Sequence, residues 1–284
     1  SATHQKLLHC EFPGSFFSII SGMSASTFFE ESENVRVSRL QRRKKHSKEN
    51  SVAVVIASRR AEDLEDLCDD LFKQTLPKFS IYIGLHGYQP DAKLKGKLDR
   101  LKRRNIKVKV ERFNTDATLG KILSTLCEVS SERFVAKMDD DDIYGPEHLH
   151  DLLDVLIENQ CDVAGKAMNY IYLDSINLTV RRATGVGVSQ YELFDDWVCG
   201  GTIMVSRSAG EKAGWFGSGV TAVDTHLLQG VKTNGGKIWR TYGAGYIYRR
   251  RENNHTYSTN YAKYLNAASE EWVGLVRGAE FGVR

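Results

Sequence analysis

The strongest constraint on the fold is an unbroken apolar run at Val52–Ala57. A run of this kind is typical of a β-strand that is buried on both of its faces. Such strands occur mostly in sheets that are covered by helices on both sides. The run therefore predicts an α/β domain that begins close to Ser51.

Downstream of this run, apolar residues recur in turn at the spacing of strands and of helices. The predicted strands are residues 52–57, 79–85, 106–110 and 133–138, and the predicted helices are residues 64–71, 91–104, 119–126 and 149–157. Repeated strand–helix order produces a mostly parallel central sheet that is flanked by helices. Ligands of such sheets bind at the carboxyl ends of the strands.

After Asp162 the pattern becomes less regular. Candidate strands lie at residues 163–173, 202–205 and 245–249, and a helix is predicted at residues 223–231. This part indicates a smaller second half built onto the sheet, where we expect the acceptor of a reaction to bind.

We expect three regions along the chain. Residues 1–50 are an N-terminal extension or a linker from a larger protein, residues 51–255 form the α/β domain, and residues 256–284 are a helical C-terminal extension. The strongly basic stretch Arg36–Lys48 suits either a solvated linker or a contact with phosphate-rich or membrane-surface anions.

No segment has the composition of a membrane-spanning helix. The longest uncharged run, Phe12–Phe29, contains Pro13, Gly14, Gly22 and many hydroxyl residues. A spanning helix needs about 20 predominantly apolar residues. The run also lacks the basic region and the small-residue cleavage site of a signal peptide. We therefore expect no transmembrane segment and no secretory leader.

Composition excludes several classes of protein. Hydrophobic residues make up 41% of the chain, which excludes gross disorder, and the formal net charge of only +3 argues against a nucleic-acid partner. The five cysteines are widely spaced and include no CxxC pair, so they fit neither a disulfide framework nor a zinc site. We expect them to be buried free thiols in a reducing compartment.

Four consecutive aspartates, Asp139–Asp142, directly follow the predicted strand at residues 133–138. Alternate residues of an extended chain point the same way, so Asp139 and Asp141 are placed to share one divalent ion. Mg²⁺ or Mn²⁺ suits carboxylates combined with substrate phosphates. The alternatives are a solvated acidic loop, or a role for Asp142 in capping the helix that begins near Pro146.

The order of several segments resembles that of the family 2 glycosyltransferases, which have the GT-A fold. The segments are Val52–Arg59, Leu71–Pro77 with its Gln-Thr-Leu-Pro turn, Leu119–Lys121, and Ala136–Asp142. The likeness covers about residues 51–255. It implies an α/β fold of GT-A type and an inverting transfer of a sugar from a nucleoside-diphosphate sugar to a hydroxyl acceptor, with Mn²⁺ or Mg²⁺ as cofactor.

The resemblance also implies a setting for the reaction. It suggests bacterial surface polysaccharide synthesis, with a glycan or a lipid-linked molecule as the acceptor. The location would be cytoplasmic, at the inner face of the membrane, and would allow peripheral membrane contact. The absence of a leader pattern and the reduced cysteines agree with that side of the membrane.

For the catalytic base, the resemblance points to the Asp of a Glu-Asp pair that begins a late helix. Asp224 occupies that position, and Val223 stands where the family has its Glu. A carboxylate within hydrogen-bond reach takes the proton of the attacking hydroxyl. The alternative is an ordinary Asp at a helix N-terminus, which the helix dipole stabilises.

Other family positions supply candidate contacts with the two substrates. The donor site is expected to contain Ala57, Ser58, Arg59, Asp116, Lys121, Asp140 and Arg251, and the acceptor site Trp197, Gly200, Gly201 and Asp142. Bare glycine backbone would let a sugar approach, and a Trp would stack on a sugar face. The alternatives are a tight turn at the glycines and a core position for the Trp.

Three arginines, Arg249–Arg251, precede a segment that ends in His255. The family often has an Arg or a His here, on a loop that closes over the diphosphate. Arginine forks match phosphate oxygens, so Arg251 is assigned to the donor and His255 to the metal. Alternatively, the arginines pair with acids elsewhere and His255 packs structurally.

In one place the sequence departs from the family. The second strand usually ends in an Asp that binds the nucleotide base, whereas this chain has His86 there. Either His86 substitutes for that Asp, or the backbone and Asp116 hold the base. The identity of the nucleotide is therefore left open.

Two other functions remain as alternatives. A nucleotidyl- or sugar-phosphate transferase is also an α/β, metal-dependent enzyme, but it usually has a Gly-rich phosphate loop that residues 57–60 lack. A degenerate carbohydrate-binding module would not need Asp139, Asp141 and Asp224, which are all present.

Overall fold

The computed structural model describes residues 37, 50–182, 193–251 and 260–276. Its core is an eight-stranded sheet with the strand order β3-β2-β1-β4-β10-β6-β11-β9. In that order the strands are Lys107–Phe113, Phe79–His86, Val52–Ser58, Phe134–Lys137, Met204–Ser206, Val163–Lys166, Ile238–Thr241 and Leu193–Phe194. Four of the neighbouring pairs are parallel, namely β3/β2, β2/β1, β1/β4 and β6/β11. The predicted mostly parallel sheet is therefore confirmed.

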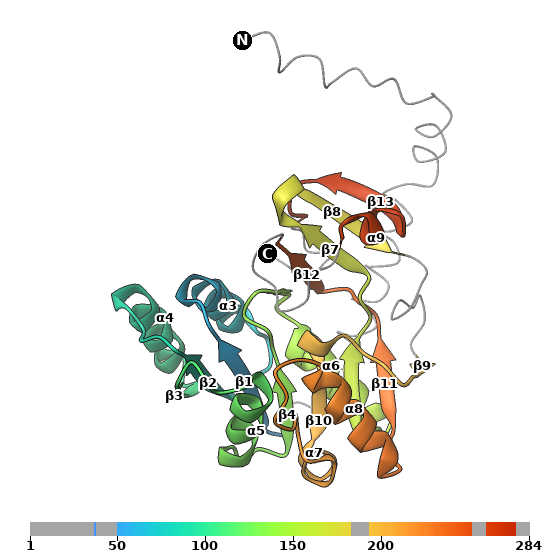
Figure 1. Ribbon diagram of the computed structural model, residues 1–284. Helices are drawn as coiled ribbons and strands as arrows, with labels where there is room; N and C mark the ends of the chain where they lie inside the picture. Colours follow the sequence, from blue (N-terminus) through green and yellow to red (C-terminus); the bar gives the residue numbers. More distant parts are fainter. Residues whose placement is uncertain (1–36, 38–49, 183–192, 252–259, 277–284) are drawn as a thin grey trace, which may run out of the picture.

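Helices cover both faces of this sheet (Figure 1). They are α3 (Ala61–Lys73), α4 (Ala92–Arg103), α5 (Leu119–Val129), α6 (His148–Glu158), α7 (Arg207–Ala213) and α8 (Val223–Thr233). One core cluster combines Val54 and Ile56 of β1 with residues of α3, α4 and α6. The other combines Ala53 and Val55 with residues of α5, α7 and α8. Alternate side chains of β1 thus point to opposite faces, as its unbroken apolar run predicts.

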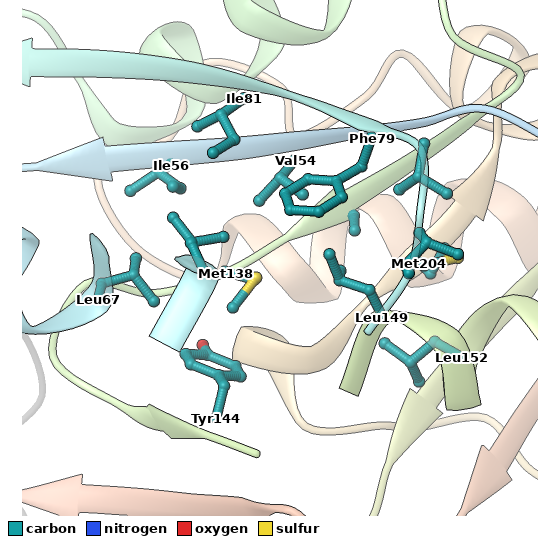
Figure 2. Close-up of a cluster of buried hydrophobic side chains, with 14 of the residues drawn as sticks. Val54, Ile56, Leu67, Phe79, Ile81, Met138, Tyr144, Leu149, Leu152 and Met204 are labelled. Carbon is teal, nitrogen blue, oxygen red and sulfur yellow. The ribbon is translucent and has the colours of Figure 1, made fainter. Parts of the chain in front are cut away.

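Figure 2 shows the first of these clusters, in which apolar side chains from the sheet and from the helices of one face meet. Ile56 and Val54 of β1 lie beside Ile81 of β2, with Leu67 of α3 and Leu149 of α6 on the helix side. All five side chains are at most 1% exposed. Each such side chain contributes roughly 1.5–3 kcal/mol through burial, so this packing holds the strand ends that bear the site.

A second, five-stranded sheet has the order β13-β8-β7-β12-β5. Its strands are Ala268–Val273, Leu178–Arg182, Tyr170–Leu173, Tyr246–Arg250 and Ile143–Tyr144; two single-turn 3₁₀ helices, Asp174–Ile176 and Gly200–Thr202, and the short helix α9 (Ala262–Leu265) complete the described elements. Strand β5 comes directly after the aspartate run, so the second sheet lies against the site.

Two details differ from the sequence predictions. The single strand expected at residues 163–173 is two strands, β6 and β7, that belong to different sheets. The C-terminal extension was expected to be helical, but within residues 260–276 the four-residue helix α9 is followed by strand β13, which pairs with β8. Alternating exposure along β13 shows why: only one of its faces packs on the protein, and that requires a period of two.

The Gln-Thr-Leu-Pro turn clamps β5 and α6 against α3. The Gln74 side chain, which is fully buried, donates from Nε2 to the Gly145 carbonyl at 2.8 Å and accepts at Oε1 from the Leu149 amide at 3.1 Å. The Thr75 amide adds a bond to the Pro146 carbonyl at 2.7 Å. The chain just after the aspartate run is thereby fixed in place.

We expect Gln74→Ala to lower the free energy of unfolding by about 1–3 kcal/mol, because it leaves a buried carbonyl and a buried amide without partners. Urea unfolding followed by circular dichroism measures the change. The exposed neighbour Lys78 is the control, since Lys78→Ala should change stability by no more than about 0.5 kcal/mol. Equal stability of the two variants would contradict the clamp.

Candidate functional site

The four aspartates leave the carboxyl end of β4 in the middle of the large sheet. Tyr144, 1% exposed, fixes the start of this run: its hydroxyl accepts from the Asp139 amide at 2.8 Å and donates to the Gly201 carbonyl at 2.8 Å. A single buried hydroxyl therefore joins the aspartate run to the glycine segment predicted at the acceptor side.

A buried lysine joins two of the predicted site residues. Lys137 is the last residue of β4, and its Nζ lies 2.7 Å from Asp139 Oδ1 and 3.1 Å from Asp224 Oδ1. The lysine side chain is 2% exposed, whereas the two carboxylates are 35% and 32% exposed. Burial by itself lowers the pKa of Lys137, but the two carboxylates outweigh burial and raise it. The ammonium group therefore stays charged beneath two carboxylates that face solvent.

The two glycines at 200 and 201 leave room for protein carboxylates. A Cβ on Gly200 would overlap the Asp224 carboxylate, and a Cβ on Gly201 would lie 2.7 Å from Asp142 Oδ2 and 3.0 Å from Asp139 Oδ2. Both positions thus need the missing side chain in order to bring Asp224 and the aspartate run together. Direct contact of these glycines with an acceptor stays a prediction.

Asp142, predicted at the acceptor side, points into the protein. Its Oδ2 accepts from the Tyr246 hydroxyl at 2.6 Å and its Oδ1 from the Arg249 amide at 3.0 Å, and the residue is 6% exposed. Burial, with Asp141 and Asp139 close by, raises the pKa of Asp142 well above its ordinary value. Asp142 therefore ties the aspartate run to β12 of the second sheet.

Asp140 and Asp141 complete the run. Asp141 Oδ2 lies 3.6 Å from Arg60 Nη2. Burial, together with the neighbouring Asp141 carboxylate, raises the pKa of Asp140 to about 8. Within the described residues, Asp140 Oδ2 is buried without a hydrogen-bond partner. The negative charge of the run thus exceeds what the surrounding cations compensate.

These carboxylates suit a hard divalent cation. No set of three His, Cys, Asp or Glu side chains that could hold a metal ion forms among the described residues, and His255 lies outside them. Mg²⁺ commonly needs only one or two protein carboxylates, with substrate phosphates and water as its other ligands. Asp139, Asp141 and the unpartnered oxygen of Asp140 therefore fit such an ion together with a phosphate-bearing substrate.

The donor side begins at the ends of β1 and β2. Arg59 Nε donates to His86 Nδ1 at 2.9 Å, and His86 Nε2 lies 3.0 Å from the Thr115 carbonyl oxygen. Because a carbonyl can only accept, the imidazole carries its proton on Nε2 and accepts at Nδ1. His86 thus links Arg59 to the loop that contains Asp116.

The remaining donor-side residues surround this link. Ala57 and Ser58 end β1, and the Ser58 hydroxyl lies 2.7 Å from Tyr88 Oη. Asp116 is exposed in the loop between β3 and α5, and Lys121 is exposed in the first turn of α5. All of these residues follow the carboxyl ends of neighbouring parallel strands, where ligands of such sheets bind. Their contacts with a donor stay predictions.

The arginines after β12 pair with acids. Arg251 Nη1 lies 2.6 Å from Asp63 Oδ1 and its Nε 3.1 Å from Asp174 Oδ2. Arg249 Nη2 lies 2.9 Å from the same Asp174 oxygen. These pairs supply negative charge without a bound nucleotide, so the dense positive charge alone does not require a diphosphate. The donor contact of Arg251 stays a prediction.

Trp197 is half-buried and packs against both core clusters of the large sheet. Its carbonyl accepts from Arg240 Nη1 at 3.4 Å. This setting matches the core position that the sequence left open as the alternative, and stacking of Trp197 on a sugar stays a prediction.

A cavity of about 250 Å³ opens beside the aspartate run. Its walls include Asp140–Asp142, three aspartates of α3 (Asp66, Asp69 and Asp70), and Arg249 and Tyr172 of the second sheet. Larger cavities of about 670 and 620 Å³ lie elsewhere, next to Phe134 and Ser206 and next to Phe194 and Ile238. Phe134 and Ile238 begin strands of the large sheet, so those hollows are at the end opposite to the carboxylates.

Sequence reasoning missed Lys137, Tyr144 and Tyr246, which hold the carboxylates in place. Lys137 left one signal, because it is a charged residue inside an otherwise apolar buried strand, Phe134–Met138. A buried charge normally needs a partner of opposite sign. The tyrosines left no comparable signal, since a buried Tyr in a strand is common.

The sheet order, the carboxylates at the strand ends and the second sheet beside them define a GT-A fold. A family model described as glycosyl transferase family 2 matches residues 51–202, and the chain belongs to this family. A comparison with curated proteins finds no match.

Solved structures with the same fold include two of TarS residues 1–349 from S. aureus. One has a TM-score of 0.55 at 17% identity, with 70% of this chain and 60% of that chain covered; the other, in complex with UDP-GlcNAc, has 0.58 at 16%, with 76% and 64% covered. This chain thus spans less than two thirds of the length of those structures.

Another solved structure with this fold is the mannosyltransferase PcManGT from Pyrobaculum calidifontis, in complex with GDP-Man and Mn²⁺. It has a TM-score of 0.54 at 12% identity, with 82% of this chain and 68% of that chain covered.

The raised pKa of Asp140 predicts a pH dependence of stability. With a pKa of about 8 when folded, against about 3.9 when unfolded, the folded state holds the proton more tightly. The stability from this group is therefore complete below about pH 4 and is lost as the pH rises through about 8. Asp140→Asn keeps a neutral side chain at every pH, so it removes this loss.

Urea unfolding in EDTA at pH 5 and pH 8 measures the effect. The stability of Asp140→Asn relative to wild type should rise by at least about 1 kcal/mol between these two pH values. Asp99→Asn on α4, where the carboxylate is 57% exposed, is the control and should follow wild type. Parallel pH profiles for Asp140→Asn and wild type would contradict the assignment.

Proposed function

We propose that this protein is an inverting glycosyltransferase that moves a sugar from a nucleoside-diphosphate sugar to a hydroxyl acceptor. The observation that carries the proposal is the joining of Asp224 to Asp139 by Lys137 at the carboxyl ends of the sheet. One carboxylate lies in the run suited to a cation and a diphosphate, and the other lies at the start of a separate helix. Membership of glycosyl transferase family 2 supports this function.

In the proposed reaction, Asp224 accepts the proton of the acceptor hydroxyl as that hydroxyl attacks the anomeric carbon. Attack comes from the face opposite to the departing diphosphate, which inverts the configuration. Lys137 lies beneath Asp224 and holds its Oδ1, so Oδ2, the oxygen next to Gly200, is the one placed to take the proton.

Asp139 and Asp141 would hold Mn²⁺ or Mg²⁺, which neutralises charge on the departing diphosphate when it is bound. Arg60, next to Asp141, adds a fixed positive charge on the same side. The complex of PcManGT with GDP-Man and Mn²⁺ supports this use of a metal. His255 is proposed as a further ligand on the strength of the family resemblance.

The donor nucleotide is proposed only as a class. TarS was crystallised with UDP-GlcNAc and PcManGT with GDP-Man, so the fold accommodates different bases. In this chain, His86 and the loop with Asp116 would meet the base. We further propose that the acceptor is a glycan or a lipid-linked molecule in bacterial surface polysaccharide synthesis, and that the reaction takes place in the cytoplasm.

Thermal unfolding with UDP, GDP, CDP and dTDP, each with and without Mn²⁺, tests the proposed function. A diphosphate present at about 100 times its Kd should stabilise the protein by about 2.7 kcal/mol. Stabilisation by one diphosphate that needs Mn²⁺ supports a metal-dependent transferase. A response to a nucleoside triphosphate and not to any diphosphate would favour a nucleotidyltransferase, and no response to any nucleotide would favour a carbohydrate-binding module.

Asp224→Asn should lower kcat by at least about 100-fold, because the amide keeps the size of the side chain but cannot accept a proton. Affinity for the stabilising nucleotide, measured by calorimetry, should stay within about threefold of wild type. A loss of nucleotide affinity instead would place Asp224 in the donor site and remove it as the base.

Gly200→Ala should lower kcat by about tenfold or more while the protein stays folded, because the new methyl group displaces the Asp224 carboxylate. Gly96→Ala on α4 is the matched control: its Cβ meets nothing within 4 Å, and it should leave kcat unchanged and raise stability by about 0.5–1 kcal/mol. Equal kcat in the two variants would show that Asp224 does not depend on the bare backbone.

A further inference from the structure

The edge of the protein formed by α4 and β3 carries an excess of positive charge. Residues 91–113, here called the basic edge, contain ten Lys and Arg against three Asp and Glu, a net charge of +7. The whole chain has a net charge of only +3, so the rest of the chain carries −4. Neither the candidate site nor the proposed function uses this charge.

The basic edge lies at the margin of the fold (Figure 1). β3 is the outermost strand of the large sheet, and α4, which leads directly into it, packs against α3. Nine of the ten basic residues are exposed, and Lys97 is half-buried. The charges therefore face solvent on one continuous part of the surface.

Most of these charges have no acidic partner. Lys93, Lys97, Arg100 and Lys102 form ion pairs with Glu65, Asp69 or Asp99. Within the described part of the chain, no carboxylate forms an ion pair with the other six, which are Lys95, Arg103, Arg104, Lys107, Lys109 and Arg112. Cations gathered in this way repel one another, and an anionic partner would relieve the repulsion.

We propose that the basic edge binds the surface of an anionic lipid bilayer. Clustered Lys and Arg side chains are attracted to anionic lipid headgroups, and the attraction acts within about 10 Å at ordinary ionic strength. The binding is peripheral and reversible, since no described helix is long and apolar enough to cross a bilayer.

An extended surface fits the layout of these charges better than a single small anion does. They are spread along a helix of about 18 Å and a strand of about 23 Å. None of the three cavities described above has a wall residue from the basic edge. Val110 of β3, 38% exposed among the cations, supplies an apolar contact for the lipid interface.

Protection of the sheet edge and binding of nucleic acid each account for less of this charge. Lysines on an edge strand prevent pairing with another sheet, which explains Lys107 and Lys109 but not the charges of α4. Single-stranded nucleic acid is bound on exposed aromatic side chains. The only aromatic residue of the basic edge is Phe113, which is half-buried against the core.

The position of the basic edge gives the contact a consequence. β3 ends at Phe113, whose carbonyl accepts from the Gly87 amide at 2.9 Å, and the chain continues into the loop with Thr115 and Asp116. Lipid binding here would hold the Arg59–His86 side of the site close to the membrane.

Vesicle co-sedimentation of the full chain tests the proposal. We expect binding to vesicles of phosphatidylcholine in which about one lipid in three is phosphatidylglycerol, little binding to pure phosphatidylcholine, and release in about 1 M salt, where the screening length falls to about 3 Å. The triple variant Lys95→Glu, Arg103→Glu, Lys109→Glu should reduce the partition coefficient at least about tenfold. Circular dichroism and melting temperature show whether the variant is folded; if it is not, the three Gln substitutions replace it and should also weaken binding.

The matched control makes the same change of charge at exposed lysines elsewhere, Lys212→Glu, Lys237→Glu and Lys263→Glu, and should bind like wild type. Equal loss of binding in the control would show that net charge alone matters and would overturn the proposal. So would equal binding to neutral vesicles, or full binding by the basic-edge variant with loss on substitution of Arg42, Arg43, Lys44 and Lys45. Tighter retention of wild type on duplex DNA than on the vesicles would point to a polyanionic chain and would also overturn it.

Discussion

The candidate site depends on one buried ammonium group. Lys137 lies between Asp139 and Asp224, and without that positive charge the two carboxylates would repel each other across a poorly solvated gap. Breaking a buried ion pair by removing one partner is strongly destabilising, commonly by about 3–5 kcal/mol. The lysine therefore sets the distance between the side of the site suited to a diphosphate and the group suited to take a proton.

The rest of the site is arranged around an excess of negative charge. Tyr144 and Tyr246 place buried hydroxyls on the aspartate run, and each links it to a different element, Gly201 in one case and β12 in the other. Asp140 is compensated least, and its pKa of about 8 reflects that. The strain is useful in a site for a cation and a diphosphate, because binding of positive charge stabilises the ionised carboxylates. Stability is given up at the site and recovered in the packed core of Figure 2.

The large sheet could be predicted from the sequence, because its β1 to α6 portion alternates regularly between a buried-strand run and an amphipathic helix. The position of the aspartate run followed from the same pattern, since it comes directly after a buried strand. The second sheet could not be predicted in this way. β5 has only two residues, and β13 becomes a strand only because β8 pairs with it. Likewise, the partners of Arg249 and Arg251 are Asp63 and Asp174, distant in sequence, and no local pattern reveals such pairs.

The two halves of the site come from parts of the chain that differ in how closely they follow the family. The family model ends at residue 202, so it includes the aspartate run and both glycines but not Asp224, Tyr246 or Arg249. The site is nevertheless complete only when α8 brings Asp224 over Gly200 and β12 brings Tyr246 to Asp142. The matched part thus supplies carboxylates suited to a diphosphate, and the later part supplies the base and the wall around it. Because an acceptor must lie beside the base, differences between relatives in acceptor choice should arise in the later part, while the aspartate run stays the same.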